Sequence, residues 1–286
     1  MISADQAGWN GRKRKVGIGS TEAACIEIAG QEPALVLVHG FSDTSRSFSL
    51  LAPHLAGRRL VIPDLRGHGA SPAGTRGFAP ADFAEDVAGL IERLRLERPV
   101  LVGHSLGSMV AIEAAARYPE MIGGLVLMAG TLRPQIGEDH PITIGVRALR
   151  DPISPADPFY DYWHACEAEV PADFLTMAAK EASAMPAALW RAILEQVRRV
   201  DLTDKARTLR LPALVIAGER DLLFDETHQR RLLEEIPSAA FVSAVRCGHN
   251  PHWEDPALVA AAIARYFKVR TKAGPQPTAE ATGSAG

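Results

Sequence analysis

The pentapeptide 103–107, Gly-His-Ser-Leu-Gly, constrains the fold of this chain more than any other stretch. It follows the apolar run 99–102, which is typical of a buried strand, and it precedes the Ala-rich stretch 108–118, which is typical of a helix. Ser105 therefore lies in a tight turn between a strand and a helix. The two flanking glycines fit this turn because a side chain there would collide with the neighbouring strand or helix. Such a turn holds the hydroxyl outwards, and the helix N-terminus behind it favours negative charge.

A G-x-S-x-G motif alone also occurs in ordinary glycine-rich turns, so the rest of the chain must decide its meaning. The 286 residues, 47% hydrophobic and 23% charged, allow a sizeable core in one large domain or two small ones. A net charge of −3 gives no reason to expect a nucleic-acid partner. The three cysteines lack metal-ligand spacing, which indicates a reducing, cytoplasmic location.

No apolar run is long enough to span a membrane, so we expect no membrane partner. The basic cluster 12–15 is followed by no apolar segment of the kind found in signal peptides, and we interpret it as a solvated surface patch.

Alternating apolar strands and amphipathic helices predict an α/β fold. Short connections between them favour a mostly parallel, doubly wound sheet of about eight strands with helices on both faces, opened by a two-stranded hairpin. The predicted strands cover 13–19, 23–29, 34–38, 59–63, 99–102, 124–128, 213–217 and 240–245, and the predicted helices cover 45–55, 82–96, 108–118, 226–236 and 256–267.

The alternation stops between residues 131 and 210, where seven prolines separate helix-like pieces such as 174–183 and 187–199. We expect a helical cap, or lid, inserted between the two parts of a core that covers 13–130 and 211–268. The preceding strand ends on the same side of the sheet as Ser105, so this insertion should lie over the serine. Residues 1–12 are expected to be loosely ordered. The tail 269–286, rich in Pro, Gly, Thr and Ala, is expected to be disordered.

Four predicted strand ends carry chemically useful residues: 39–41 (His-Gly-Phe), Ser105, 218–221 (Gly-Glu-Arg-Asp) and 247–249 (Cys-Gly-His). The carboxyl ends of parallel strands meet at one edge of a sheet, so these groups should gather there. A serine hydroxyl needs a base to take its proton, and an imidazole titrates near neutrality. His249 is the candidate base, with His252 as its rival. Asp221 would hold the imidazole tautomer, with Asp225 and Glu219 as rivals.

These motifs, spread over roughly residues 15–268, resemble the α/β-hydrolase fold superfamily, whose catalytic residues follow the order nucleophile, acid, histidine. The resemblance implies that Ser105 is the nucleophile, Asp221 the acid and His249 the base, because His249 follows a glycine directly after the last strand. It favours His249 over His252. Family members with an alternative acid place it after the strand equivalent to 124–128, where this chain has Ala-Gly-Thr.

A tetrahedral intermediate also needs donors for its oxyanion. The backbone N–H of Leu106, directly after the serine, is one candidate, and the resemblance implies the N–H of Phe41 as the other. His104 is expected to pack inside the turn, and we name it with Trp163 and Trp190 as candidate contacts of the substrate pocket. His39 is expected to brace the oxyanion loop by hydrogen bonds.

The segment 64–71, Asp-x-Arg-Gly-x-Gly-x-Ser, also matches the family and is expected to form a charge-braced structural turn. No metal-ligand motif is present, and the Gly-x-Gly at 17–19 lacks the remainder of a dinucleotide fingerprint. We therefore expect neither a metal nor an organic cofactor.

The leading hypothesis is a cofactor-independent serine hydrolase that cleaves a carboxylic ester or lactone of a small molecule through an acyl-enzyme. Aromatic residues of the cap favour a hydrophobic or aromatic substrate, although they equally fit packing of the cap onto the core. Serine at the nucleophile position argues against the epoxide hydrolases and haloalkane dehalogenases of the superfamily, which use aspartate. A C–C bond hydrolase of ring-fission diketones, a cofactor-free haloperoxidase or perhydrolase, and a ligand-binding receptor remain open, as does a homodimer.

Overall fold

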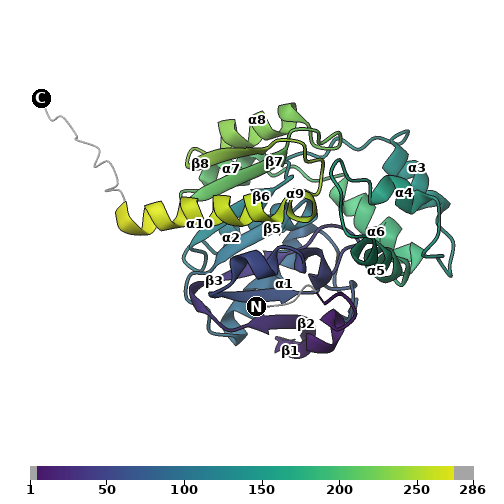
Figure 1. Ribbon diagram of the computed structural model, residues 1–286, viewed down its shortest axis with the longest axis horizontal. Helices are drawn as coiled ribbons and strands as arrows, with labels where there is room; N and C mark the ends of the chain where they lie inside the picture. The colour runs from purple at the N-terminus through teal and green to yellow at the C-terminus, as the bar shows by residue number, and fades with distance from the viewer. Residues whose placement is uncertain (1–4, 274–286) are drawn as a thin grey trace, which may run out of the picture.

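A computed structural model describes the backbone of residues 5–273 and the side chains of residues 5–267 (Figure 1). In this part of the chain, eight strands form one sheet in the order β1-β2-β4-β3-β5-β6-β7-β8. β1 and β2 form an antiparallel hairpin, β2 pairs antiparallel with β4, and the other neighbours are parallel. The predicted α/β fold is confirmed. The strands are β1 Arg14–Ile18, β2 Thr21–Ile28, β3 Gln31–Val38, β4 Arg58–Pro63, β5 Val100–His104, β6 Gly124–Met128, β7 Ala213–Gly218 and β8 Ala239–Ala244.

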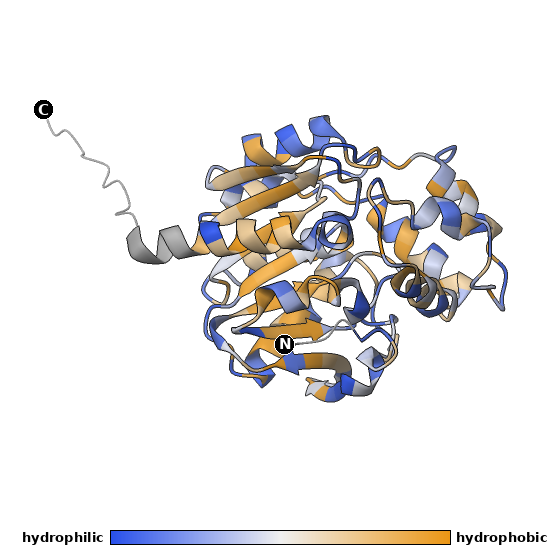
Figure 2. Cartoon of the chain, in the orientation of Figure 1, coloured by the Kyte–Doolittle hydropathy of each residue, from blue (hydrophilic) through white to orange (hydrophobic). Residues whose placement is uncertain are grey.

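Helices cover both faces of the sheet. One face carries α1 (Pro80–Arg93), α2 (Leu106–Arg117), α7 (Thr203–Thr208) and α8 (Glu226–Glu235). The other carries α10 (Pro256–Ala273), which crosses in front of the sheet in Figure 1. The short helix α9 (Pro251–Glu254) precedes α10 and contacts it. β5, β6 and β7 are buried along their whole length, and they appear apolar in Figure 2. Strands covered on both sides need continuous apolar runs, which explains why their positions follow from the sequence.

Four helices between β6 and β7 form a lobe beside the carboxyl ends of the parallel strands (Figure 1). They are α3 (Pro141–Ala148), α4 (Phe159–Trp163), α5 (Ala172–Ser183) and α6 (Ala187–Val197). Prolines 171 and 186 directly precede α5 and α6 as their N-cap residues, where the missing N–H removes no hydrogen bond within the helix. The chain then returns to the sheet through α7, which packs against α2 and α8.

The predicted helix over 45–55 is wrong. The structure has two short 3-10 helices instead, η2 (Ser45–Phe48) and η3 (Ala52–Leu55). Pro53 lies in the first turn of η3, where its missing N–H has no cost. In the middle of one long α-helix, the same proline would lose a hydrogen bond and clash with the preceding turn.

The segment before β1 is more ordered than expected over the residues that the structure describes. Residues 9–12 form the 3-10 helix η1, and Trp9 is fully buried. Gln6 is also buried, and its Nε2 donates to Ser49 Oγ at 2.9 Å. Lys13 of the predicted surface patch forms a buried ion pair with Asp64 at 2.8 Å. Burial of these residues depends on partners far away in the chain.

At the other end, α10 continues to Ala273, beyond the predicted end at residue 267. The prediction of a disordered tail from residue 269 is therefore wrong for 269–273, and residues 274–286 lie outside the described residues. Within the described part, no helix combines the length and apolar character needed to cross a membrane.

Candidate active site

The turn between β5 and α2 holds Ser105 in a left-handed backbone conformation, with φ 52° and ψ −114°. A Cβ at Gly103 would lie 2.2 Å from the carbonyl oxygen of Gly107. A Cβ at Gly107 would lie 2.0 Å from the carbonyl oxygen of Val38 on β3. Both contacts are with backbone, which cannot move aside easily. Glycine is therefore required on both sides of the serine, and the strained turn directs the serine towards the edge of the sheet.

Ser105, His249 and Asp221 form a connected chain of hydrogen bonds. Ser105 Oγ lies 3.0 Å from His249 Nε2, and His249 Nδ1 lies 2.9 Å from Asp221 Oδ2. The Asp221 carboxylate also accepts backbone N–H bonds from Leu223 and Phe224 at 2.9 and 3.0 Å. Because an ionised carboxylate can only accept, Nδ1 carries the proton and Nε2 is free to accept the serine proton. The structure thus brings together the three residues that the sequence proposes as nucleophile, base and acid.

The pKa values of this pair move in opposite directions. Burial would lower the pKa of His249, but the charge of Asp221 and its hydrogen bond outweigh this effect, so the pKa is raised above 6.5. Burial would raise the pKa of Asp221, but His249 and the two backbone amides outweigh it and lower this pKa. An aspartate that stays ionised and a histidine with enhanced basicity suit general-base chemistry.

The rival residues make other contacts. His252 is fully buried, and its Nε2 lies 2.9 Å from Ser47 Oγ. Burial holds the pKa of His252 well below its usual value, and the neighbouring histidines lower it further. Asp225 caps the N-terminus of α8 by accepting from the amides of residues 227 and 228. Glu219 is exposed on the turn after β7.

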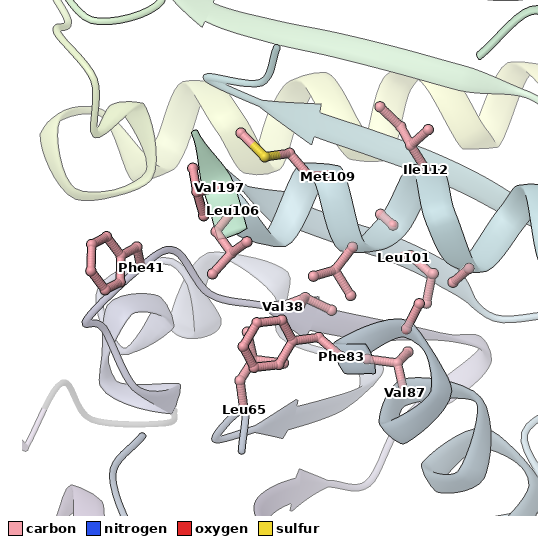
Figure 3. Packing of buried hydrophobic residues seen from close by; sticks show 14 of the residues in the cluster. Val38, Phe41, Leu65, Phe83, Val87, Leu101, Leu106, Met109, Ile112 and Val197 are labelled. Atoms are coloured by element: carbon pink, nitrogen blue, oxygen red, sulfur yellow. The ribbon is translucent and has the colours of Figure 1, made fainter. Parts of the chain in front are cut away.

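The loop after β3 carries the second proposed oxyanion donor, Phe41. His39 braces this loop from the core: its Nδ1 donates to the Gly40 carbonyl at 2.8 Å, and its Nε2 accepts from the Leu65 backbone N–H at 2.9 Å. Leu106 opens α2, where the first amides have no partner within the helix. Phe41 and Leu106 belong to one buried cluster with Met109 (Figure 3).

A cavity of about 300 Å³ opens over Ser105 between the sheet and the lobe. Its apolar wall includes Met109, Ile136, Ile142, Leu194 and Val197. Four of these five residues lie between β6 and β7, and Met109 comes from α2 of the core. The catalytic candidates on the floor of the cavity come from the core, so neither part forms the cavity alone.

Two of the three proposed pocket contacts line this cavity. Trp163 of α4 does so, and so does His104, whose Nε2 donates to the His249 carbonyl at 2.9 Å. Trp190 does not. It is fully buried, it donates through Nε1 to the Ala182 carbonyl at 3.2 Å, and it packs behind Phe41 with ring centroids 5.0 Å apart. We therefore correct its role from a pocket contact to a support of the pocket wall.

A buried carboxylate in the cavity, Asp43, was not predicted from the sequence. Its side chain is 8% exposed, its Oδ2 lies 3.6 Å from His104 Nδ1, and it accepts from Ser47 Oγ at 3.1 Å. A signal was available, because Asp43 lies two residues after Phe41 on the loop that follows β3. The apolar wall residues had no such signal, since apolar residues at helical spacing usually serve packing alone.

The turn 64–71 is a structural brace, as predicted. Asp64 accepts backbone N–H bonds from Ser45 and Ala70, both at 2.8 Å. Arg66 forms a buried two-bond ion pair with Asp86, with both N···O distances at 2.6 Å. Among the side chains that the structure describes, no group of three His, Cys, Asp or Glu residues is arranged to hold a metal ion.

This chain is similar in sequence and in fold to known hydrolases. 2-(acetamidomethylene)succinate hydrolase of Mesorhizobium japonicum is 28% identical to this chain, in an alignment that covers 93% of this chain and 99% of the relative. Pimeloyl-[acyl-carrier protein] methyl ester esterase of Xanthomonas campestris pv. campestris is 29% identical over 84% of this chain and 97% of its own. A thermophilic esterase from Thermogutta terrifontis superposes with a TM-score of 0.75 at 26% identity, covering 90% of this chain and 98% of its own. The family model described as the alpha/beta hydrolase family matches residues 35–262, and the chain therefore belongs to that family.

Proposed function

We propose that this protein is a serine hydrolase that cleaves a carboxylic ester or lactone through an acyl-enzyme. The observation that carries the proposal is the hydrogen-bonded chain Ser105–His249–Asp221, which lies at the N-terminus of α2 and lines the cavity. Two of the relatives described above are named esterases, which supports the same reaction class.

In the proposed reaction, Ser105 Oγ attacks the carbonyl carbon while His249 Nε2 takes the serine proton. The oxyanion accepts hydrogen bonds from the backbone N–H groups of Leu106 and Phe41. His249 then gives its proton to the leaving alcohol as the acyl-enzyme forms. In the second half, His249 takes a proton from water, the hydroxyl attacks the acyl carbon, and Ser105 leaves with the proton returned to it. Asp221 keeps the imidazole in the required tautomer throughout.

The cavity supports a small, neutral, hydrophobic acyl group. Its volume lies at the lower end of small-molecule sites, and its deep wall is apolar. Among the described residues that line it, Arg220 carries the one guanidinium or ammonium group, is 54% exposed, and pairs with Glu167 at 3.5 Å. Asp43 adds a buried negative charge. A substrate with its own carboxylate, such as the succinate derivative named for one relative, would find no buried cation here.

The test is turnover of p-nitrophenyl esters of increasing acyl length, of the hemisuccinate ester and of γ-lactones. We expect neutral esters to be hydrolysed faster than the hemisuccinate. Ser105→Ala should remove this activity, while the exposed control Ser154→Ala should retain it. Labelling of Ser105 by a fluorophosphonate gives a second readout that does not depend on the substrate chosen.

The alternatives predict other results in the same assays. A C–C hydrolase would cleave a vinylogous diketone faster than any ester, and a perhydrolase would transfer the acyl group to peroxide in preference to water. A receptor would bind ligands without turnover. Absence of ester and lactone hydrolysis in a folded wild-type protein would refute the proposal.

A further inference from the structure

Trp163, on α4 of the lobe, reaches the loop that carries the proposed oxyanion donor. Its Nε1–H donates to Ser42 Oγ at 2.7 Å, across 121 residues of sequence. Its ring also packs edge-to-face against Phe41, with centroids 5.5 Å apart. The indole therefore contacts two consecutive residues of the loop, one by a polar bond and one by packing.

Ser42 has a backbone conformation that it would not adopt without support. Its φ of 65° lies in the left-handed region, where a Cβ is unfavourable. Ser42 is 3% exposed, so its hydroxyl has little access to water. The indole N–H supplies the hydrogen bond that burial would otherwise remove, and strained residues of this kind persist when their surroundings hold them.

Phe41, like Ser42, is held by contacts with the lobe. Its ring contacts the rings of both Trp163 and Trp190, and the two indoles lie 5.4 Å apart. His39, in the core, holds the same loop through the Gly40 carbonyl and the Leu65 backbone N–H. The loop that carries the Phe41 peptide N–H is thus held by contacts from the core and by contacts from the lobe.

We propose that Trp163 is a positioning residue that sets the oxyanion hole by holding Ser42 and Phe41. This inference rests on the proposed serine-hydrolase function. Trp163 also lines the cavity, so its role through Ser42 must be separated from its role as a wall. The two roles differ in consequence: a wall changes which acyl groups fit, whereas an oxyanion donor stabilises the same transition state for every ester.

The test compares Trp163→Phe, Ser42→Ala and the double variant with wild type. Trp163→Phe keeps an aromatic ring and removes the N–H, and Ser42→Ala removes the acceptor. The control is Tyr118→Phe, a tyrosine at the C-terminal end of α2 that does not line the cavity. We measure kcat and KM on an acetate and a hexanoate ester, and the inhibition constant of a trifluoromethyl ketone, which forms a tetrahedral oxyanion on the serine.

We expect each single variant to lower kcat about tenfold on both esters with KM unchanged, because only a transition-state interaction is lost. The double variant should resemble the singles, since both remove one hydrogen bond. The inhibition constant should rise by the same factor as kcat falls. Tyr118→Phe should match wild type.

An unchanged kcat in both single variants would overturn the inference. So would a kcat loss in the double variant equal to the two single losses combined, or an effect confined to the longer ester or to KM. If Trp163→Phe has a lower melting temperature than wild type, the same comparison of kcat, KM and the inhibition constant is made with Ser42→Ala alone. Failure of the underlying function gives a different pattern, in which wild type itself hydrolyses no ester or Ser105→Ala remains active.

Discussion

Glu181 on α5 connects the lobe to the N-terminal part of the chain, and its removal is expected to destabilise the fold strongly. Its Oε1 accepts from Arg46 Nε and from Asn10 Nδ2, each at 2.7 Å, and its Oε2 accepts from Thr44 Oγ1 at 2.5 Å. The Arg46 side chain is 1% exposed and that of Glu181 is 12% exposed. The ion pair is therefore buried, and three segments meet at a single carboxylate.

The size of the effect follows from this burial. Among the described residues, Glu181→Ala leaves the buried guanidinium of Arg46 with only the neutral oxygens of Gln6 as partners, at 2.6 and 3.0 Å. Breaking a buried pair in this way costs about 3–5 kcal/mol of unfolding free energy. For a chain of this size, that corresponds to a melting temperature lowered by roughly 10 °C. Glu181→Gln keeps one acceptor oxygen but loses the charge, and should cost about 2 kcal/mol.

The assay is urea unfolding followed by circular dichroism, with thermal melting as a second measure. The control is Glu22→Gln, which removes an exposed ion pair with Lys15 and should change the unfolding free energy by about 0.5 kcal/mol or less. If Glu181→Ala unfolds within about 1 kcal/mol of wild type, the carboxylate does not join the lobe to the core, and the reasoning from burial fails.

Three further predictions concern the active site. The value of kcat/KM should fall as pH falls through the raised pKa of His249, so the acid limb of the pH–rate profile should have its midpoint above 6.5. In Asp221→Asn this acid limb should move to lower pH, and the plateau of kcat/KM should fall about 10⁴-fold. An acid limb that does not move in Asp221→Asn would contradict the pairing of His249 with Asp221. His249→Gln should lose nearly all ester turnover while His252→Gln keeps most of it, and reversed severities would place the base at residue 252. Gly107→Ala should yield little soluble protein, because its Cβ would lie 2.0 Å from a backbone oxygen of β3, whereas Gly137→Ala, with open space around it, should purify as wild type.

The central strands could be predicted closely from the sequence. β6 begins and ends at the predicted residues, and β5 and β7 differ by one or two. These strands are buried on both faces, so nearly all of their positions lack polar side chains and the apolar pattern is continuous. The three residues of the proposed triad were also found, because each lies within five residues of the carboxyl end of a parallel strand, where the topology places it at the common edge.

Segments whose structure depends on distant partners could not be predicted. Trp9 and Gln6 precede the first strand and show no periodic pattern, yet both are buried. Gln6 is held by Ser49, 43 residues away. Such contacts exist only after the sheet has formed and brought the two segments together.

The two tryptophans of the lobe show the same division between sequence and tertiary structure. The sequence by itself determined that Trp163 and Trp190 lie in the insertion after the strand 124–128, with Trp190 in a helix-like piece, and that Ser105, Asp221 and His249 follow strand ends. It did so because local apolar patterns and glycine spacing specify strands, helices and turns. Only the tertiary structure decided that Trp163 faces the cavity and bonds to Ser42 while Trp190 packs behind Phe41. The direction in which a helix presents one side chain depends on how its axis lies against the sheet, and packing between segments far apart in the chain decides that orientation.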